Sequence, residues 1–482
     1  MLRRRLMFVS GPGSLPRARG AAALLAGALM PYAFSPYDHV WLAWLAMACW
    51  VGLFRYGHAF FIGFAFGFGW FGFGAWWLAD TLHLYGHLHY LLAVFCVGLV
   101  GAVLALFPAL WAWLSMRLAG DSGWLVLVFP AVGVGIEWLR GHIFTGLPWT
   151  ALGNLLLETP AVGWGSWVGV YGLTLLPALA AGSLPLLLAP EGRRWGAGGL
   201  LAACLLLFAA PAPFTATGVE RHAALVQANI PQDVKWDAGF VAETMRRYAS
   251  LSEGTAADVI VWPEAAVPFF LSQAPGWDAW LEARIRHWRT PLLFGGLKLL
   301  EDGHTGQNGL FLADPQTGQR RFAGKHHLVP FGEYVPAWLP FLHTLVPEIA
   351  DFRSAEDTGV LTWKGQTFGV LICYESIFPE QTRQRIGHGA QVLVNVTNDA
   401  WYGTSPAAWQ HLQAMRMRAV EAGRYVLRAA NTGVSAIIAP DGSLTATAPW
   451  WTQAVINGTY RASTRITPYQ QWGDTPLLAG LL

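Results

Sequence analysis

Three residues with reactive side chains each belong to a distinctive short motif in the second half of the chain. Glu264 follows Val-Ile-Val-Trp-Pro, Cys373 follows Val-Leu-Ile, and Lys325 opens the segment Lys-His-His-Leu-Val-Pro-Phe-Gly-Glu. A thiol is a poor nucleophile until it loses its proton, and a carboxylate can accept that proton. An ammonium group can stabilise both the thiolate and the oxyanion that forms after its attack. Together the three side chains predict acyl transfer through a thioester on Cys373.

Each of these residues also has an ordinary explanation when it is considered alone. Glu264 could pair with an arginine, Lys325 could be a solvated surface charge, and Cys373 could fill part of a hydrophobic core. Their flanking sequences and their order favour one shared site. Open α/β folds place ligand chemistry at the carboxyl ends of strands, so this site requires strands that end at these residues.

The sequence from about residue 218 to 466 has the pattern of such an α/β domain. Short apolar runs that end in polar residues are typical of buried strands. These runs are 223–226, 259–262, 292–294, 368–372 and 392–396. Helical patterns are present at 240–253 and 407–426, and hairpins are expected at 308–322 and 434–447. The sequence contains no Walker A or Rossmann glycine pattern.

The first 213 residues are instead a series of apolar stretches, each near the ~20 residues that cross a bilayer. With 54% hydrophobic and only 12% charged residues, the composition is that of a membrane protein. We expect a transmembrane helical bundle of about seven spans in residues 1–213. The spans are 20–36, 40–54, 57–79, 90–116, 123–139, 161–189 and 196–213.

Arginines predict the orientation of this bundle through the positive-inside rule. They are concentrated before the first span and in alternate loops, at Arg3, Arg4, Arg5, Arg17, Arg19, Arg55, Arg117, Arg193 and Arg194. The N-terminus is therefore expected in the cytoplasm, and an odd number of spans places residue 214 onward on the opposite side. No A-x-A cleavage site follows the first span, so we interpret it as a retained anchor. Residues 467–482 form a C-terminal tail, which is either the end of the domain or part of a final transmembrane helix.

The composition argues against nucleic-acid binding and against a metal centre. The sequence has no run of Lys or Arg that would indicate a nucleic-acid partner. Its four cysteines form no CxxC or Cys/His ligand spacing, and Cys49, Cys96 and Cys204 lie in apolar runs. His83, His87 and His89 have metal-like spacing without a flanking carboxylate, so an interfacial loop is the preferred interpretation.

These motifs resemble a known family. Trp-Pro-Glu264, the Lys325 segment and Cys373-Tyr374-Glu375 are similar to the Glu/Lys/Cys triad of the nitrilase superfamily, and more narrowly to the apolipoprotein N-acyltransferase family. In the membrane half, the matching segments are 33–38, 137–141 and 146–149. In the second half, they also include 227–232, 235–236 and 398–403. The C-terminus departs from the family, which usually has an eighth span.

The resemblance implies an αββα sandwich on the periplasmic side of a multi-pass protein of the bacterial inner membrane. It implies that an acyl chain, typically from sn-1 of phosphatidylethanolamine, passes through a Cys373 thioester to the amine of a diacylglyceryl-cysteine apolipoprotein, with ping-pong kinetics. Glu264 would be the general base, Cys373 the nucleophile and Lys325 the oxyanion stabiliser. No cofactor and no metal are expected, and the protein is expected to act as a monomer.

Supporting roles are expected for four further residues. Glu333 could orient Lys325 or assist proton transfer, Glu375 could do the same beside Cys373, and Trp236 and Tyr374 could shape an acyl pocket. Arg140, a charge at the edge of a span, is costly without a partner. His326 and His327 are adjacent, so neither is assigned to a metal.

Two alternative functions are compatible with parts of this pattern. A membrane-tethered nitrilase or amidase would use water to resolve the thioester, because acceptor choice depends on pocket shape and water exclusion. A catalytically silent scaffold or a transporter is a further alternative, although the spans show no inverted repeat.

An apolar segment between Glu333 and Asp351 contains three prolines. It is expected either to be an ordinary loop packed in the core or to form a lid that dips into the membrane. The residues that would enter the membrane are Trp338, Leu339, Phe341, Leu342 and Leu345.

Overall fold

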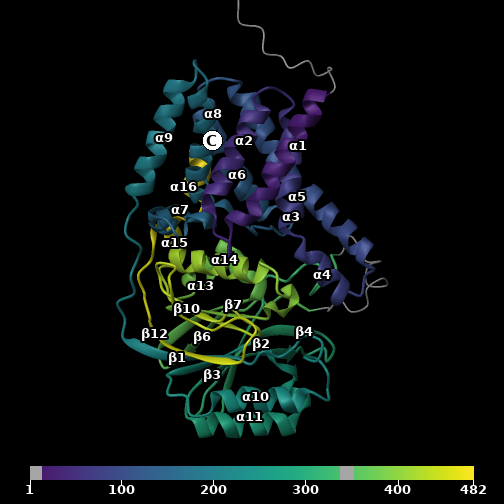
Figure 1. Cartoon of the computed structure of the whole chain (residues 1–482). Helices are drawn as coiled ribbons and strands as arrows, with labels where there is room; N and C mark the ends of the chain where they lie inside the picture. Colours follow the sequence, from purple (N-terminus) through teal and green to yellow (C-terminus); the bar gives the residue numbers. More distant parts are fainter. Residues whose placement is uncertain (1–13, 337–351, 482) are drawn as a thin grey trace, which may run out of the picture. The chain divides into compact units, whose positions relative to one another are not determined.

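The computed structural model describes residues 14–336 and 352–481, which divide into two compact units (Figure 1). The first unit contains the described residues up to 161, residues 170–210 and residues from 474 on, and the second contains 162–169 and 211–473. All five residues of the expected lid lie outside the described residues, so the lid stays a prediction.

The first unit is helical. Its helices are α1 (Ser14–Leu29), α2 (Val40–Phe54), α3 (Ala59–Gly74), α4 (Trp77–Leu84), α5 (Tyr90–Ala119), α6 (Leu125–His142), α8 (Leu175–Leu188), α9 (Arg193–Phe208) and α16 (Thr475–Leu481), and α7 (Gly165–Leu173) crosses the boundary between the units. Two described helices, α5 and α6, are long and apolar enough to cross a membrane. Two bent helix pairs, α3 with α4 at 48° and Pro160–Leu173 with α8 at 62°, bring the number to as many as four if each pair is one span. The expected seven spans stay a prediction.

Close approach of α1 and α3 explains two glycines of this unit. A Cβ atom at Gly27 would lie 1.9 Å from the carbonyl oxygen of Phe66, and one at Gly69 would lie 2.1 Å from that of Leu24. Small residues at such positions let two helix backbones pack directly against each other, as they do in membrane bundles. Any larger residue at either position would force α1 and α3 apart.

The outward face of α5 is apolar. Leu91, Phe95, Leu99 and Val103 follow one another at intervals of four residues, and each is more than half exposed. Residues with this spacing lie on one side of a helix. An exposed apolar stripe of this length is suited to contact with lipid rather than water.

A buried ion pair explains the charge of Arg140. Its Nε and Nη2 atoms donate to the two carboxylate oxygens of Glu137 at 3.0 and 2.9 Å, and its Nη1 donates to the carbonyl oxygens of Leu147 and Trp149. Arg140 therefore has the partner that its position requires, and it fastens the loop after α6 to the helix.

The second unit contains two six-stranded sheets. The first sheet has the order β12-β1-β2-β3-β4-β5, from β1 (Glu220–Gln227), β2 (Val259–Phe270), β3 (Leu292–Leu299), β4 (Gly306–Ala313), β5 (Arg320–Gly324) and β12 (Ala454–Arg461). The second has the order β11-β10-β9-β8-β7-β6, from β6 (Val360–Trp363), β7 (Gln366–Ile372), β8 (Val392–Thr397), β9 (Val426–Ala430), β10 (Ala436–Ile438) and β11 (Leu444–Thr447). The central strands of both sheets are parallel and the outer ones antiparallel.

The two sheets face each other and helices cover their outer faces (Figure 1). One core cluster joins Leu225 and Val261 of the first sheet to Val394 of the second. Helices α10 (Val241–Ser252) and α11 (Pro275–Trp288) pack on the first sheet, and α13 (Pro379–Gly387) and α14 (Ala407–Ala422) pack on the second. The predicted αββα sandwich is thereby confirmed.

Local predictions hold with two differences. The strand expected over 259–262 continues as β2 to Phe270, so Glu264 lies inside an irregular strand rather than after its end. Both expected hairpins are present, as β4 with β5 and as β10 with β11. The helix expected over 407–426 ends at Ala422, because Gly423 adopts a left-handed conformation with φ of +61° and closes the helix. Val426 already begins β9.

Candidate active site

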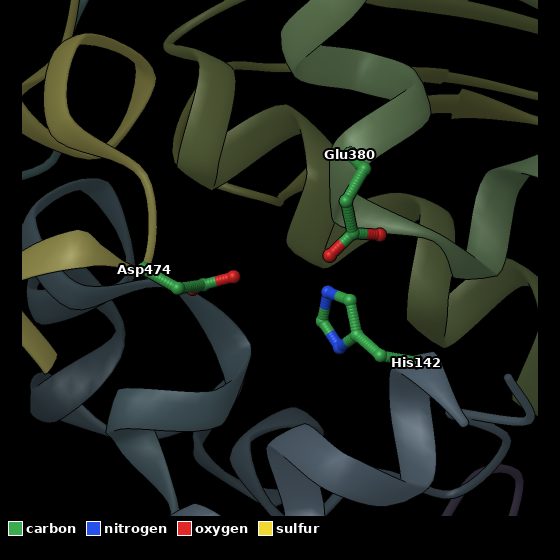
Figure 2. Close-up of side chains that lie close together, drawn as sticks. All are labelled: His142, Glu380 and Asp474. Atoms are coloured by element: carbon green, nitrogen blue, oxygen red, sulfur yellow. The ribbon is translucent and has the colours of Figure 1, made fainter. Parts of the chain in front are cut away.

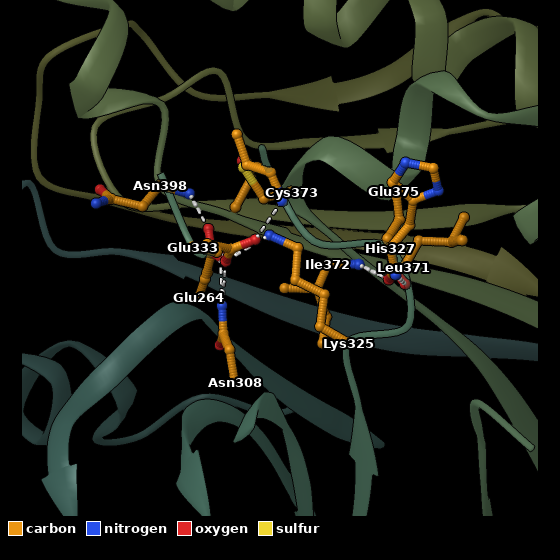
Figure 3. A network of polar contacts seen from close by, with 12 residues as sticks. Glu264, Asn308, Lys325, His327, Glu333, Leu371, Ile372, Cys373, Glu375 and Asn398 are labelled. Atoms are coloured by element: carbon orange, nitrogen blue, oxygen red, sulfur yellow. Dashed lines mark hydrogen bonds and ion pairs between the residues drawn. The ribbon is translucent and has the colours of Figure 1, made fainter. Parts of the chain in front are cut away.

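The structure brings Glu264, Lys325 and Cys373 together inside the second unit (Figure 3). Glu264 lies in β2, Lys325 directly follows β5, and Cys373 directly follows β7. The three residues are 7%, 1% and 7% exposed. The three expected site residues therefore share one buried location that both sheets contribute to.

Glu264 lies in an irregular stretch of β2. The pairing of β2 with β3 is regular as far as Trp262 with Phe294 and shifts before Val267 pairs with Gly296. A Cβ atom at Gly295 would lie 2.3 Å from the carbonyl oxygen of Pro263, so only glycine lets β3 follow this irregularity. Such irregularities redirect side chains next to active sites.

Both carboxylate oxygens of Glu264 are held. The Asn308 amide nitrogen donates to Oε1 at 2.8 Å, and the backbone N–H of Asn398 donates to Oε2 at 3.0 Å. The Lys325 Nζ lies 3.7 Å from Oε1. The carboxylate is thus fixed in direction, with a cation on one side.

Lys325 lies between two carboxylates. Its Nζ donates to Glu333 Oε1 at 2.8 Å, and the backbone N–H of Val329 holds the other oxygen of Glu333 at 2.8 Å. Burial by itself lowers the pKa of a lysine, but the carboxylates of Glu333 and Glu264 outweigh it and raise the pKa of Lys325 above its usual range. Lys325 therefore stays an ammonium at neutral pH.

Cys373 occupies a strained backbone position. It has a φ of +49° at the start of a short 3₁₀ turn, η5 (Cys373–Ile377). A non-glycine residue in this region costs about 1–3 kcal/mol and persists only where its surroundings hold it. The turn ends β7 abruptly and places the thiol where the charges of Glu264 and Lys325 both act on it.

The thiol of Cys373 is protonated in the resting site. Burial and the neighbouring carboxylate of Glu264 raise the pKa of the Cys373 thiol, and the Lys325 ammonium opposes them only in part. A site with this charge balance needs a base at the moment of attack, because little thiolate exists beforehand. Glu264 is the carboxylate in position to supply that function.

Glu375 lies two residues after Cys373 in the sequence, but its carboxylate binds backbone N–H groups and an arginine. Its Oε1 accepts from the backbone N–H groups of His326 and His327 at 2.8 and 3.1 Å, and its Oε2 accepts from Ile372 at 2.7 Å. The Arg385 guanidinium lies 3.3 Å from Oε1. Glu375 thus ties the loop after Lys325 to the end of β7.

The two aromatic residues expected at the site lie in different surroundings. The Tyr374 ring is buried and contacts the rings of His327 and Phe378, whose own rings stack at 4.0 Å. Trp236 is 48% exposed. A cluster of packed aromatic rings therefore begins directly after Cys373, whereas about half of Trp236 is exposed.

Sequence reasoning did not identify two of the polar residues at this site. Asn308, inside β4, contacts both Glu264 and Glu333. Lys235 is 2% exposed, and its Nζ donates to the backbone carbonyl oxygen of Glu264 at 3.0 Å. Burial lowers the pKa of Lys235 to about 8, against the attraction of Glu264 and Cys373. The sequence signals for Lys235 were its place beside Trp236 and the resemblance of the segment 235–236 to the family.

Figure 2 draws His142 and Asp474 of the first unit and Glu380 of the second. His142 ends α6, where its ring stacks on that of Trp138 at 4.2 Å and its Nδ1 lies 2.7 Å from the Trp138 carbonyl oxygen. Glu380 lies in the first turn of α13, where a carboxylate suits the helix dipole. Asp474 precedes α16, and its carbonyl oxygen accepts from the backbone N–H of Leu478. We assign no metal to them.

The sandwich and its buried Glu, Lys and Cys define a domain of the carbon-nitrogen hydrolase class, and the model of that family matches residues 222–469. A second family model, the apolipoprotein N-acyltransferase N-terminal domain, matches residues 26–183. The chain belongs to the apolipoprotein N-acyltransferase family. These matches confirm the predicted family. They also confirm that the protein belongs to a class of enzymes with a cysteine nucleophile and that it is a membrane protein. They argue against a silent scaffold and against a transporter.

Curated relatives match nearly the whole chain. The apolipoprotein N-acyltransferase of Methylococcus capsulatus is 38% identical over 95% of this chain and 94% of its own. That of Chromobacterium violaceum is 36% identical over 95% of this chain and 91% of its own. Among solved structures, an amidase from Nesterenkonia sp. is a remote match, with a TM-score of 0.39 and 19% identity over 56% of this chain and 98% of its own.

Proposed function

We propose that this protein transfers an acyl chain from a phospholipid, through a thioester on Cys373, to the N-terminal amine of a diacylglyceryl-cysteine apolipoprotein. The observation that carries this proposal is the buried ammonium of Lys325, which lies 3.7 Å from Glu264 and acts electrostatically on Cys373. The names of the curated relatives support the acceptor.

In the first half-reaction, Cys373 Sγ attacks the ester carbonyl carbon of the phospholipid while Glu264 accepts the thiol proton. The S–C bond forms as the carbonyl π electrons move to oxygen, and the Lys325 ammonium stabilises the resulting oxyanion. The tetrahedral intermediate then expels the lysophospholipid alkoxide, which takes the proton from Glu264. Cys373 is left as an acyl thioester.

In the second half-reaction, the amine of the apolipoprotein attacks the thioester. Glu264 accepts a proton from the amine, the oxyanion forms again beside Lys325, and the C–S bond breaks. The departing thiolate takes the proton held by Glu264, which restores the starting state. Two products released in turn give ping-pong kinetics.

Glu333 serves this cycle as the counter-ion of Lys325. Its carboxylate is held by Val329 and contacts Nζ at 2.8 Å. Because Glu333 keeps the lysine charged, Glu264 can be protonated and deprotonated without loss of the ammonium. Glu264 thus transfers protons, and Glu333 balances the charge of Lys325.

The test is mass analysis of the intact protein after incubation with phosphatidylethanolamine of one defined acyl chain. The expected result is one acyl adduct on Cys373, lost when a diacylglyceryl lipopeptide is added and retained in buffer alone. Cys204→Ala, which changes an exposed cysteine of α9, serves as the matched control and should acylate normally. Rapid loss of the adduct in buffer would favour the hydrolase alternative, and normal turnover by Cys373→Ala would refute the proposal.

We propose further that the protein lies in the bacterial inner membrane with its second unit in the periplasm. The arginines of the N-terminal segment and of alternate loops support this orientation through the positive-inside rule. Asp302 and Glu191 are both exposed, in the turn after β3 and in the turn between α8 and α9. A membrane-impermeant maleimide should label Asp302→Cys but not Glu191→Cys in spheroplasts, and the reverse pattern would overturn the orientation.

A further inference from the structure

A fully buried polar network lies behind the turn that carries Cys373. His411 of α14, Asp399 and Arg428 of β9 each have no exposed surface. Asp399 accepts from Thr397 Oγ1 at 2.7 Å and from Arg428 at 2.6 Å. The network lies outside the Glu264, Lys325 and Glu333 cluster, and no step of the mechanism above uses it.

His411 connects this network to the backbone of the nucleophile. Its Nδ1 lies 2.9 Å from Asp399 Oδ1 and 3.3 Å from Arg428 Nη2, so these two groups set the orientation of the ring. Its Nε2 lies 3.0 Å from the carbonyl oxygen of Cys373 and 2.7 Å from Ser376 Oγ. Both of these partners belong to the short turn η5.

The same carboxylate also reaches the other side of the nucleophile. Thr397, which donates to Asp399, is a hydrogen-bond partner of the Cys373 side chain. Asp399 therefore links a histidine on the Cys373 carbonyl to a hydroxyl on the Cys373 thiol. A residue with a φ of +49° needs such support from its surroundings, because its backbone conformation is unfavourable by itself.

We propose that His411 is a positioning residue, which holds the Cys373 turn in the geometry for attack through its contacts with the Cys373 carbonyl and Ser376, while Asp399 orients its ring. The proposal rests on the proposed function, since it assumes that Cys373 is the nucleophile. A nucleophile displaced by about 1 Å can lose about 10²-fold in rate, so support of this kind affects the chemical step more than lipid binding.

Two amide substitutions test the contributions of the two ring nitrogens of His411 separately. The amide of Gln reaches approximately the position of Nε2 and can donate to the Cys373 carbonyl, whereas the shorter Asn reaches approximately the position of Nδ1. His411→Gln and His411→Asn both keep a polar side chain at this site. They differ mainly in whether that side chain reaches the turn η5, which begins at Cys373. Leu412→Ala is the matched control, because Leu412 is a buried core residue next to His411 on α14.

The experiment measures the single-turnover rate of Cys373 acylation over a range of phospholipid concentrations, together with thermal unfolding in the same detergent. We expect His411→Asn to lower the limiting rate by about tenfold or more, with half-saturation unchanged. His411→Gln should stay within about threefold of the wild type, and Leu412→Ala should lower only the unfolding temperature.

Equal rates for His411→Asn and the wild type would overturn the inference. So would equal losses in His411→Asn and His411→Gln, or a loss in Leu412→Ala as large as that in His411→Asn, since each would indicate general packing. If the wild type itself carries no acyl group on Cys373, the proposed function fails instead. The acylation of the wild type thus distinguishes the two failures.

Discussion

Replacing Glu264 with Gln should change two reactions of Cys373 in opposite directions. The substitution removes the proposed base, so acylation by phospholipid should become slower. It also removes the negative charge that, after burial, does most to raise the pKa of the Cys373 thiol. Direct alkylation of the thiol, which needs no base in this position, should therefore become faster.

The size of each effect follows from the charges. Unit charges 3.7 Å apart, the distance from Lys325 Nζ to Glu264 Oε1, interact by about 4–5 kcal/mol at an effective dielectric constant of ~20. The repulsion between Glu264 and the neighbouring thiolate is of the same order, and Glu264→Gln removes it while the Lys325 ammonium stays. If the thiol pKa falls by about 2, the thiolate fraction rises about 100-fold while the reactivity of each thiolate falls about tenfold. We therefore expect alkylation to become about tenfold faster, and acylation to become about 10²–10⁴-fold slower.

The assay compares two rates in one preparation at pH 7.5. Iodoacetamide alkylation of Cys373 and single-turnover acylation by phosphatidylethanolamine are both followed by mass analysis of the intact protein. Glu421→Gln is the matched control, because Glu421 is a buried carboxylate of α14 that pairs with Arg418 rather than with the active site. It should leave both rates of the folded protein near those of the wild type.

A parallel fall of both rates in Glu264→Gln would refute the reasoning. That result would mean that the substitution disturbs the position of Cys373. Such a disturbance would start at Asn308 or Asn398, because both donate to this carboxylate and one of them would face the NH2 of the new amide group. Unchanged acylation would show that Glu264 is not the base.

Three other predictions test the site and its surroundings. Cys373→Ala should abolish acyl transfer without loss of the fold, and Lys325→Ala should slow acylation by about 10²–10³-fold, as loss of an oxyanion donor does; near-normal turnover in either would exclude its role. Because the pKa of Lys235 is lowered from 10.5 to about 8, the folded state bears the cost of a buried charge below pH 8. Lys235→Met should therefore raise the free energy of unfolding at pH 7 by up to ~3 kcal/mol, a gain that shrinks as the pH rises from 8 to 10.5. Unfolding in denaturant across this pH range checks the gain, and a pH-independent difference would contradict it. Trp338→Ser with Phe341→Ser should slow acylation from bilayers more than from a short soluble ester, and equal losses would leave the expected lid without support.

The strands and the reactive residues could be predicted because both depend on local sequence. A buried strand requires a short apolar run, and the runs before Cys373 and around Trp262 correspond to β7 and to the start of β2. Cys373 and Glu264 follow from where those runs end. The role of Asn308 depends on distance rather than on sequence, because this residue reaches Glu264 and Glu333 only when the β4 strand is placed beside the loop after Lys325. The sequence of β4 contains no pattern that would predict this contact.

Glu375 shows how far sequence proximity can differ from chemical proximity. It lies only two residues after Cys373, closer along the chain than either Glu264 or Glu333. Yet the turn η5 that directs the thiol into the site directs the Glu375 carboxylate toward three backbone N–H groups and Arg385. A carboxylate that accepts from three backbone N–H groups and pairs with a guanidinium is suited to holding the backbone in place. The turn thus separates two neighbouring residues, the proposed nucleophile Cys373 and Glu375, which holds the surrounding loop.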